Sequence, residues 1–288
     1  MGRKFTMVLA TIALAACGSD AEEGMPMATA TFSGDGSALI ADWADGGYAF
    51  GIFVPSAGPM RDEDGNRLPA TYTPEAAAEL AQNDLLDYLF LNLEGSYDVA
   101  SVDALVEGLA TVSRDERPTL LVRLPTIERD GEEVTRQRVE EALAHRADGV
   151  VLPHIRTPEE ARLAVSFFED IGADVWSPAN PDGRIIAMLM IEDGGALAAA
   201  AEIAETPGYS VLACGIGSLG GDLGDRDAAE EGCMEVLGHA NRLGMPSMMT
   251  ASAEILQQRI DQGYRGILLQ MGDDLQEIIM AGRAATGR

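Results

Sequence analysis

The sequence is poor in basic residues and in cysteine, and its N-terminal apolar run is short. Against 47 aspartates and glutamates stand only 20 lysines and arginines, so the 288-residue chain has a formal net charge of −27 at pH 7. So acidic a surface repels nucleic acid and anionic lipid headgroups. The composition therefore argues against a nucleic-acid partner and against electrostatic membrane binding.

The first residues, MGRKFTMVLATIALAACGSDAEEG, place Arg3 and Lys4 before an apolar run over residues 5–16. This run is too short to span a bilayer and is typical of a secretory signal. It ends in LAAC, which resembles the lipobox of bacterial lipoproteins; an ordinary signal peptide with an incidental cysteine is the alternative. We expect residues 1–16 to be a signal peptide and Cys17 to carry a lipid. The protein would then be anchored in the bacterial cell envelope, facing the periplasm or the exterior.

Residues 17–36 are small, polar and acidic, which predicts a flexible tether before one folded domain over residues 37–288. Beyond Cys17 the only cysteines are Cys214 and Cys233. They fall on a predicted buried strand and the helix after it, where we expect two free, buried thiols. A disulfide between them is the alternative that an oxidising envelope would allow.

Short apolar runs alternate with longer amphipathic stretches eight times, which is typical of buried parallel strands each followed by a helix. Two of the helices have clear starts, at Thr73-Pro74 and Thr157-Pro158. The pattern predicts an α/β fold, a (β/α)8 TIM barrel, with an open doubly wound sheet as the alternative. The expected strands are residues 48–55, 88–94, 119–125, 149–155, 185–192, 210–217, 246–252 and 266–272.

Active sites of such barrels lie at the carboxyl ends of the strands. Each polar residue there, taken singly, is also compatible with a helix cap. Glu192 is the exception, because a carboxylate that ends the apolar run IIAMLMI requires a cation or hydrogen-bond donors. The residues at these ends are Glu94, Arg123, His154, Glu192, Ser218, Asp273 and Asp274.

The segments LDYLFLNLEG, LLVRLP, ALAHRADGVVLPHIRTPEEAR, AMLMIED and CGIGSLGGDLG follow one another in an order that resembles the HpcH/HpaI aldolase family. The resemblance runs from about Ser37 to the C-terminus and is most specific in RADGVVLPHIRTPEEAR. It implies a barrel that holds a divalent metal such as Mg²⁺, Mn²⁺ or Co²⁺ and binds pyruvate as its enolate. It also implies that the protein makes or breaks a carbon–carbon bond and forms a homo-oligomer.

By this resemblance Glu192 is a metal ligand and Arg123 contacts the keto oxygen of the substrate. The turn Gly217-Ser218-Leu219 matches the family's metal- and substrate-binding loop, with Ser218 as a weak neutral ligand. The chemistry needs such groups because the charge that develops on a ketone next to a carbanion is stabilised by a cation and by an arginine.

Three positions depart from the family pattern. Gly95 stands where the family has its catalytic histidine, Ala144 where it has an aspartate that supports this histidine, and Ser218 where it has a metal-binding aspartate. Glu94 is then either a supporting carboxylate or a substitute metal ligand. His154 is a substitute base, unless the alternation of the strand turns it into the helix layer.

These features leave two main hypotheses. The first is a carbon–carbon lyase with a divalent metal, acting on a small 2-oxo acid by aldol cleavage or oxaloacetate-type decarboxylation. The alternative is a lipid-anchored pseudoenzyme that binds a small carboxylate or a protein partner.

A third hypothesis, nucleotide binding, rests on the G-x-G-x-x-G spacing of Gly215, Gly217 and Gly220. The context disfavours it, because we expect the next helix to begin only near Asp227 and the following strand ends without an acid. The long connection over residues 60–74 is interpreted as a lid or as an acidic surface insertion.

Overall fold

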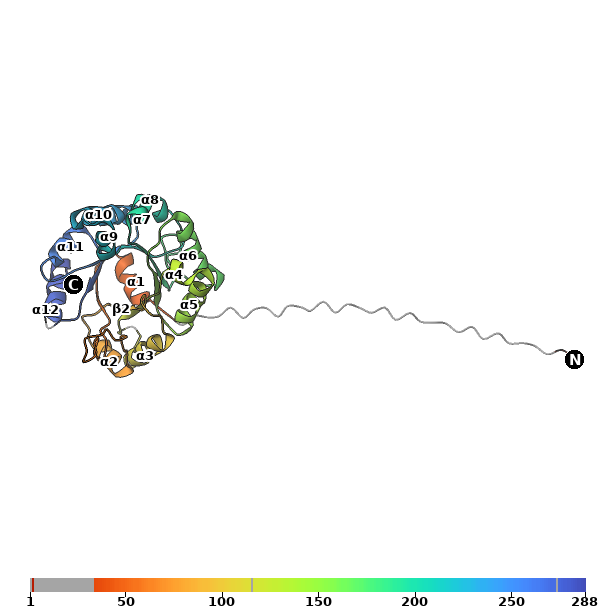
Figure 1. Cartoon of the computed structure of the whole chain (residues 1–288), viewed down its shortest axis with the longest axis horizontal. Coiled ribbons are helices and arrows are strands. Elements are labelled where there is room, and N and C mark those ends of the chain that lie inside the picture. The colour runs from red at the N-terminus through yellow and green to blue at the C-terminus, as the bar shows by residue number, and fades with distance from the viewer. Residues whose placement is uncertain (1, 3–33, 115, 273) are drawn as a thin grey trace.

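Eight parallel strands form one sheet in the order β6-β5-β4-β3-β2-β1-β8-β7 in the computed structural model of the chain. Its end strands β6 and β7 lie side by side, so the sheet is a nearly closed barrel with helices around it (Figure 1). The structure describes Gly2 and residues 34–114, 116–272 and 274–288; the predicted signal peptide, Cys17 and Asp273 lie outside them. The predicted (β/α)8 barrel is confirmed, and the open sheet is excluded.

The strands coincide with the apolar runs of the sequence, each a few residues shorter than predicted. They are β1 (Ala49–Phe53), β2 (Tyr88–Asn92), β3 (Thr119–Arg123), β4 (Gly149–Leu152), β5 (Ile186–Ile191), β6 (Val211–Cys214), β7 (Met248–Thr250) and β8 (Gly266–Leu269).

The helices begin as their capping residues predict. The Thr73 side chain accepts a hydrogen bond from the N–H of Ala76, and the Thr157 side chain accepts one from the N–H of Glu160. Within the described ranges no helix has both the length and the apolarity to cross a membrane. The helices are α1 (Ser37–Ala44), α2 (Pro74–Ala81), α3 (Val99–Leu109), α4 (Ile127–Asp130), α5 (Glu132–Ala144), α6 (Pro158–Asp170), α7 (Gly194–Ala198), α8 (Ala200–Ala204), α9 (Ile216–Leu223), α10 (Arg226–Arg242), α11 (Leu256–Gln262) and α12 (Leu275–Thr286).

Two apolar cores explain why the strands are hydrophobic on both faces. Along β2, Tyr88 and Phe90 point into the barrel, while Leu89 and Leu91 pack outward against the helices. Both cores consist of buried residues, and the packing of both faces fixes where the strand ends lie.

Helix α1, which the sequence pattern did not predict, closes the N-terminal end of the barrel. Figure 1 shows it in the middle of the ring of helices. Trp43 is buried in the inner core, where its indole N–H donates to the Arg265 carbonyl at 3.2 Å and its ring lies 6.4 Å from that of Tyr88. The barrel is therefore closed by apolar side chains at its N-terminal end, and polar groups gather at its carboxyl end.

Cys214 and Cys233 form a disulfide, so the prediction of two free thiols was wrong. Helix α10 packs directly against β6, which brings the two Cα atoms to 5.4 Å, well within the range that a disulfide requires. Sequence position placed both residues in the core but could not show that they face each other. The bond ties α10 to the strand that leads into the site.

Candidate functional site

Four polar side chains from four neighbouring strands meet at the carboxyl end of the barrel. Glu94 follows β2, Arg123 ends β3, His154 follows β4 and Glu192 follows β5. These strands are consecutive in the sheet and parallel, so their ends lie next to one another. The sequence prediction that these four residues share one site agrees with this arrangement.

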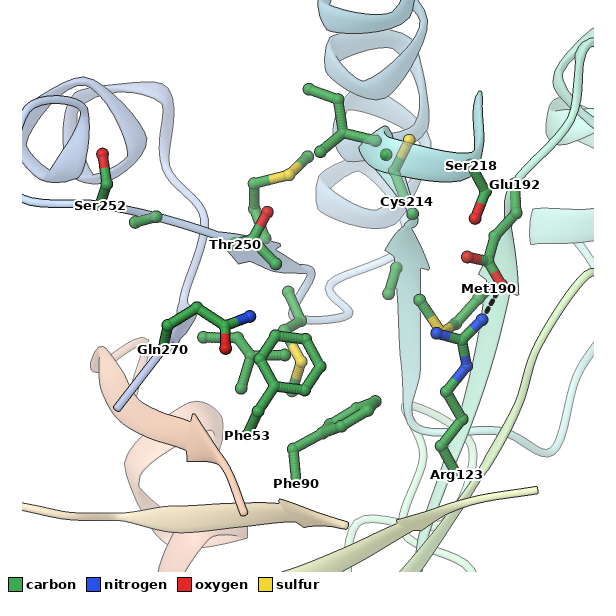
Figure 2. A pocket seen from close by; sticks show the side chains of 18 of the residues that line it. Phe53, Phe90, Arg123, Met190, Glu192, Cys214, Ser218, Thr250, Ser252 and Gln270 are labelled. Carbon is green, nitrogen blue, oxygen red and sulfur yellow. Dashed lines mark hydrogen bonds and ion pairs between the residues drawn. The ribbon is translucent and has the colours of Figure 1, made fainter. Parts of the chain in front are cut away.

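Arg123 joins the two carboxylates. Its Nη2 atom lies 2.7 Å from Oε2 of Glu192 and 2.9 Å from Oε1 of Glu94. The Glu192 side chain is only 1% exposed, which would be costly for a carboxylate without a charged partner. Figure 2 shows the Arg123–Glu192 pair at one wall of a cavity. Arg123 is thus held in place by the residues that would surround a ligand.

His154 also belongs to the cluster. Its backbone N–H donates to Oε2 of Glu192 at 3.2 Å, and its Nε2 lies 3.4 Å from Oε1 of Glu94 and 3.6 Å from Oε2 of Glu192. The suggestion that strand alternation turns His154 into the helix layer was wrong. Strand β4 ends two residues earlier, and His154 has a positive φ of 52° with its side chain directed at Glu94 and Glu192.

Glu94, His154 and Glu192 form a candidate metal centre. Each offers one ligand atom, and these atoms all lie within 4.8 Å of one another. Two carboxylate oxygens with one imidazole nitrogen suit Mn²⁺ or Co²⁺ and, with a smaller contribution from the histidine, Mg²⁺. The donor set therefore fits a divalent cation. Binding requires a neutral His154, and the cation would share the two carboxylates with Arg123.

The charges of this cluster shift two pKa values. A hydrogen bond with Glu94 raises the pKa of His154 above its ordinary 6.5, and the negative charge of Glu192 adds to the effect against burial. Burial alone would raise the pKa of Glu94, but hydrogen bonds and charges from His154 and Arg123 outweigh it and hold that pKa below 4.5. Without metal, a protonated His154 and Arg123 together balance the two carboxylates.

This balance predicts that the metal-free protein loses stability as the pH rises. A histidine whose pKa is raised on folding stabilises the protein fully below its unfolded pKa, and this contribution is lost as the pH rises through the raised value. We expect the free energy of unfolding, measured by urea titration with a chelator, to fall as the pH rises from about 6.5 through the raised pKa of His154. His154→Gln should lack this part of the slope, and equal slopes in both proteins would contradict the expectation.

The turn after β6 brings backbone against the Glu192 carboxylate. A Cβ atom at Gly215 would lie 2.1 Å from Oε1 of Glu192, so only glycine leaves room for that side chain. The helix predicted near Asp227 is α10, which begins at Arg226, but it is not the next helix as expected, because α9 begins at Ile216 directly after this turn. The glycines thus do open a helix, but they do so in a closed barrel and beside a carboxylate, and β7 ends without the acid of a dinucleotide site.

Gly215→Ala is expected to displace the Glu192 carboxylate and weaken the metal centre. The overlap lies below any normal contact distance, so the side chain or the turn must shift, at a cost of about 1–3 kcal/mol. Urea unfolding and a Mn²⁺ titration would measure both effects. Gly217→Ala is the matched control, because a Cβ there meets no atom within 4 Å. If both variants behaved alike, the close approach at Gly215 would be without consequence.

The predicted binding turn divides into residues that face the cavity and one that does not. Gly217 and Ser218 line the cavity, and Figure 2 shows Ser218 above the Glu192 carboxylate. Leu219 is fully buried in the outer core, and its N–H donates to the Gly215 carbonyl, so it is not part of the cavity wall. Only a neutral hydroxyl therefore stands beside Glu192 on this side.

The two other departures lie at opposite ends of the barrel. Gly95 is at the mouth, where a Cβ would meet nothing within 4 Å. Ala144 ends α5, just before β4 begins, and so lies at the N-terminal end. Within one chain, Ala144 and position 95 therefore do not face each other, and the motif's place in the sequence did not reveal which end of the barrel Ala144 occupies.

Arg129 is a residue of the site that the sequence did not single out. Its Nη1 donates to the carbonyls of Glu94 at 2.8 Å and Gly95 at 2.9 Å, which fixes the segment that presents the Glu94 side chain. It lies on α4, between β3 and α5, and nothing in the sequence distinguishes it from other exposed arginines. Of the two aspartates expected after β8, Asp274 precedes α12 as its cap residue.

A cavity of about 510 Å³ opens beside the cluster. Arg123, Glu192 and Ser218 form its polar wall. The rest of the lining is mostly apolar and includes Phe53 and Met248, with Thr250, Ser252 and Gln270 as polar members on the side opposite Arg123 (Figure 2). The sequence pattern identified the charged wall through its motifs, but it did not distinguish these apolar side chains from ordinary core.

The HpcH/HpaI aldolase/citrate lyase family model matches residues 72–282. Among solved structures, an HpcH/HpaI aldolase/citrate lyase family protein from Burkholderia cenocepacia J2315 is 21% identical, with a TM-score of 0.62 over 86% of this chain and 96% of that one. Macrophomate synthase is 20% identical, with a TM-score of 0.62 over 90% and 91%.

A citrate lyase beta subunit from M. tuberculosis, complexed with oxaloacetate and magnesium, is 18% identical, with a TM-score of 0.54 over 84% of this chain and 99% of that one. At such identities these structures support the fold alone. No curated protein matches the sequence. The family model spans most of the chain, from before β2 to the last helix. The chain belongs to the HpcH/HpaI aldolase/citrate lyase family.

Proposed function

We propose that the protein breaks a carbon–carbon bond of a 2-oxo acid with the help of a divalent cation held by Glu94, His154 and Glu192. The observation that carries the proposal is the convergence of these three ligands around Arg123, beside a cavity at the barrel mouth. Family membership supports the reaction class. The neighbour that is complexed with oxaloacetate and magnesium supports a small oxo acid as substrate.

When bound, the cation would supply positive charge next to the keto oxygen on which negative charge develops. Arg123 donates hydrogen bonds to the same oxygen or to the adjacent carboxylate. The first N–H groups of α9, at Ile216, Gly217 and Ser218, face the cavity without an intrahelical partner and suit that carboxylate. The residues on this wall thus bind and orient a 2-oxo carboxylate.

His154 fits the role of a ligand better than the role of a base. Its Nε2 points at both carboxylates, and His154 is not among the residues that line the cavity. Decarboxylation suits a site without a base, because the bond to the departing CO₂ breaks instead of a C–H bond. The electron pair of the broken carbon–carbon bond forms the enolate, which then takes a proton from water. We therefore favour decarboxylation over aldol cleavage.

The test is a calorimetric titration of chelator-treated protein with Mn²⁺, Co²⁺ and Mg²⁺, followed by assays with oxaloacetate and with 4-hydroxy-2-oxo acids. We expect metal binding that strengthens as the pH rises, because the cation competes with the proton on His154. Decarboxylation should exceed the rate of the metal alone. Metal binding without any turnover above that rate would overturn the proposed activity.

Ser218→Asp is expected to strengthen Mn²⁺ binding about tenfold or more, since it adds a carboxylate beside Glu192 at a position that already lines the cavity. Ser218→Asn has nearly the same shape without the charge and should leave the affinity close to that of the wild type. If the two variants bound Mn²⁺ equally, residue 218 would be too far from the cation to contribute.

A second candidate function is binding without catalysis. Arg123 and His154 both pair with the two carboxylates in the structure, and Gly95 offers no base, so the cluster can be stable as a fixed receptor. In that case a small carboxylate such as oxalate would bind with the same affinity with and without metal. The lyase predicts instead that oxalate binds more tightly when Mn²⁺ is present.

We also propose that the protein resides in the cell envelope, held by a lipid on Cys17. The disulfide Cys214–Cys233 supports this location, because such bonds persist in oxidising compartments. Cys17→Ser should release the protein from the membrane fraction of a bacterial host. A variant protein that remained in that fraction would contradict lipid anchoring at this residue.

A further inference from the structure

The cavity at the mouth is larger and more apolar than a three-carbon oxo acid requires. Its volume of about 510 Å³ lies within the range of ~300–1,000 Å³ that is typical of pockets for drug-sized ligands. Of the charged cluster, Arg123 and Glu192 line the cavity, and Arg226 is a further charged residue of the lining. The remaining surface comes from residues of β1, β2, β5, β6, β7 and β8 and is mostly apolar.

The apolar wall is built from side chains that adapt to hydrophobic ligands. Phe53 and Phe90 pack edge to face with ring centroids 5.3 Å apart, and Met190, Met248 and Met249 complete the surface. Phenyl rings supply large rigid contacts, and methionine side chains adjust to irregular apolar shapes. Figure 2 shows Phe53 and Phe90 on the floor between Gln270 and Arg123. An apolar group placed there would touch the wall while its acid group reaches Arg123.

Apolar side chains also remain exposed around the opening. Met60 after β1, Leu223 at the end of α9 and Met271 after β8 are among the few large hydrophobic residues on the described surface with high exposure. All three lie on segments that follow the carboxyl ends of strands, although none of them lines the cavity itself. Exposed apolar side chains at this end of a barrel are compatible with a ligand that is partly apolar.

We infer that the substrate is a 2-oxo acid whose carbon chain continues into an apolar group of aromatic or branched aliphatic character. Its carboxylate and keto oxygen bind at Arg123 and the candidate metal centre, and its apolar group fills the space between Phe53 and Met248. The inference rests on the proposed function for the position of the acid group. The volume of the cavity and its mostly apolar lining indicate a substrate larger and more apolar than the small oxo acid of the proposed function.

The experiment compares ligands that share one acid group and differ in the apolar part. Calorimetric titrations in the presence of Mn²⁺ use pyruvate, 2-oxobutanoate, 4-methyl-2-oxopentanoate and phenylpyruvate, with 3-phenylpropanoate as the ligand that lacks the keto group. We expect affinity to rise roughly threefold to fourfold for each buried methylene, and phenylpyruvate to bind at least about tenfold more tightly than pyruvate. Equal affinity along the series, or the tightest binding for pyruvate, would overturn the inference.

Two variants connect the gain to this wall. Phe53→Ala removes a partly exposed ring, and Thr250→Phe adds bulk from a partly exposed position on β7; both should lower the affinity for phenylpyruvate by a larger factor than the affinity for pyruvate. Met280→Ala, at an exposed position on α12, is the matched control and should change neither affinity. If phenylpyruvate kept its whole gain in affinity over pyruvate in both cavity variants, the apolar group would bind elsewhere.

The outcomes separate this inference from the proposed function. If no metal binds and no 2-oxo acid is turned over, but 3-phenylpropanoate still binds in a manner sensitive to Phe53→Ala, the lyase fails and the apolar cavity stands. If oxaloacetate is decarboxylated while the apolar series shows no gain, the lyase stands and the inference fails.

Discussion

Exchanging Glu192 for glutamine is expected to lower the affinity for Mn²⁺ by at least about a hundredfold, since changes to residues that only support a metal ligand already cost 10–100-fold. Glu192 is the most buried ligand of the candidate centre, and both Arg123 and the N–H of His154 bond to its Oε2 atom. Glutamine keeps the shape but offers the cation no charge. Oxaloacetate decarboxylation should fall with it to the rate of the metal alone.

The same exchange tests the ion pairs separately from the metal. Arg123 retains Glu94 as a partner in Glu192→Gln, so the protein should stay folded, and the melting temperature verifies this. Glu63→Gln, at an exposed acidic position in the loop after β1, removes the same charge from the mouth side and should not change Mn²⁺ affinity. If both variants bound Mn²⁺ like the wild type, the metal centre would not be at Glu192.

Reduction of the Cys214–Cys233 disulfide is expected to lower the free energy of unfolding by about 3 kcal/mol. The unfolded chain gains conformational entropy when a closed loop of this size is opened. The bond joins residues 19 positions apart, the last residue of β6 and a buried residue of α10. Urea unfolding with and without a reducing agent measures the change. Reduced protein should also bind Mn²⁺ somewhat more weakly, since Gly215 follows Cys214 directly.

A double variant, Cys214→Ala with Cys233→Ala, provides the control. It should be less stable than the oxidised wild type, and the reducing agent should not change it further. If reductant lowered the stability of this variant as well, the effect would not come from the disulfide. If the wild type were equally stable in both conditions, the bond would add nothing to the fold.

Much of the fold could be predicted from the sequence because its signals are local. Apolar runs buried on both faces identify parallel strands, and threonine–proline pairs identify helix starts, so the barrel follows from their order. Helix α1 escaped prediction because its burial depends on a barrel end assembled from distant strands. The Cys214–Cys233 bond escaped for a similar reason, since the facing of a strand and a helix is a property of packing.

For the site, the sequence identified residues but not their relations. Glu94, Arg123, His154 and Glu192 were expected at the mouth, because each ends a strand. That His154 faces the carboxylates depends on one left-handed residue, a conformation that is uncommon outside glycine and that spacing does not reveal. The requirement for glycine at 215 follows only from the position of the Glu192 carboxylate, which would lie 2.1 Å from a Cβ atom there. The order of the motifs thus identified the candidate metal ligands, and the structure showed which of them contact one another.

The positions at which the chain enters and leaves the barrel determine how the cavity mouth would be oriented if the domain were attached to a surface at one end. The N–H of Asp35 donates to Asp148, which immediately precedes β4, and Arg288 bonds to Asp87, which immediately precedes β2. Both ends of the folded domain therefore leave from the face closed by α1. An attachment at either end would orient the mouth away from the surface that holds the protein, so that ligands reach the cavity from the open side.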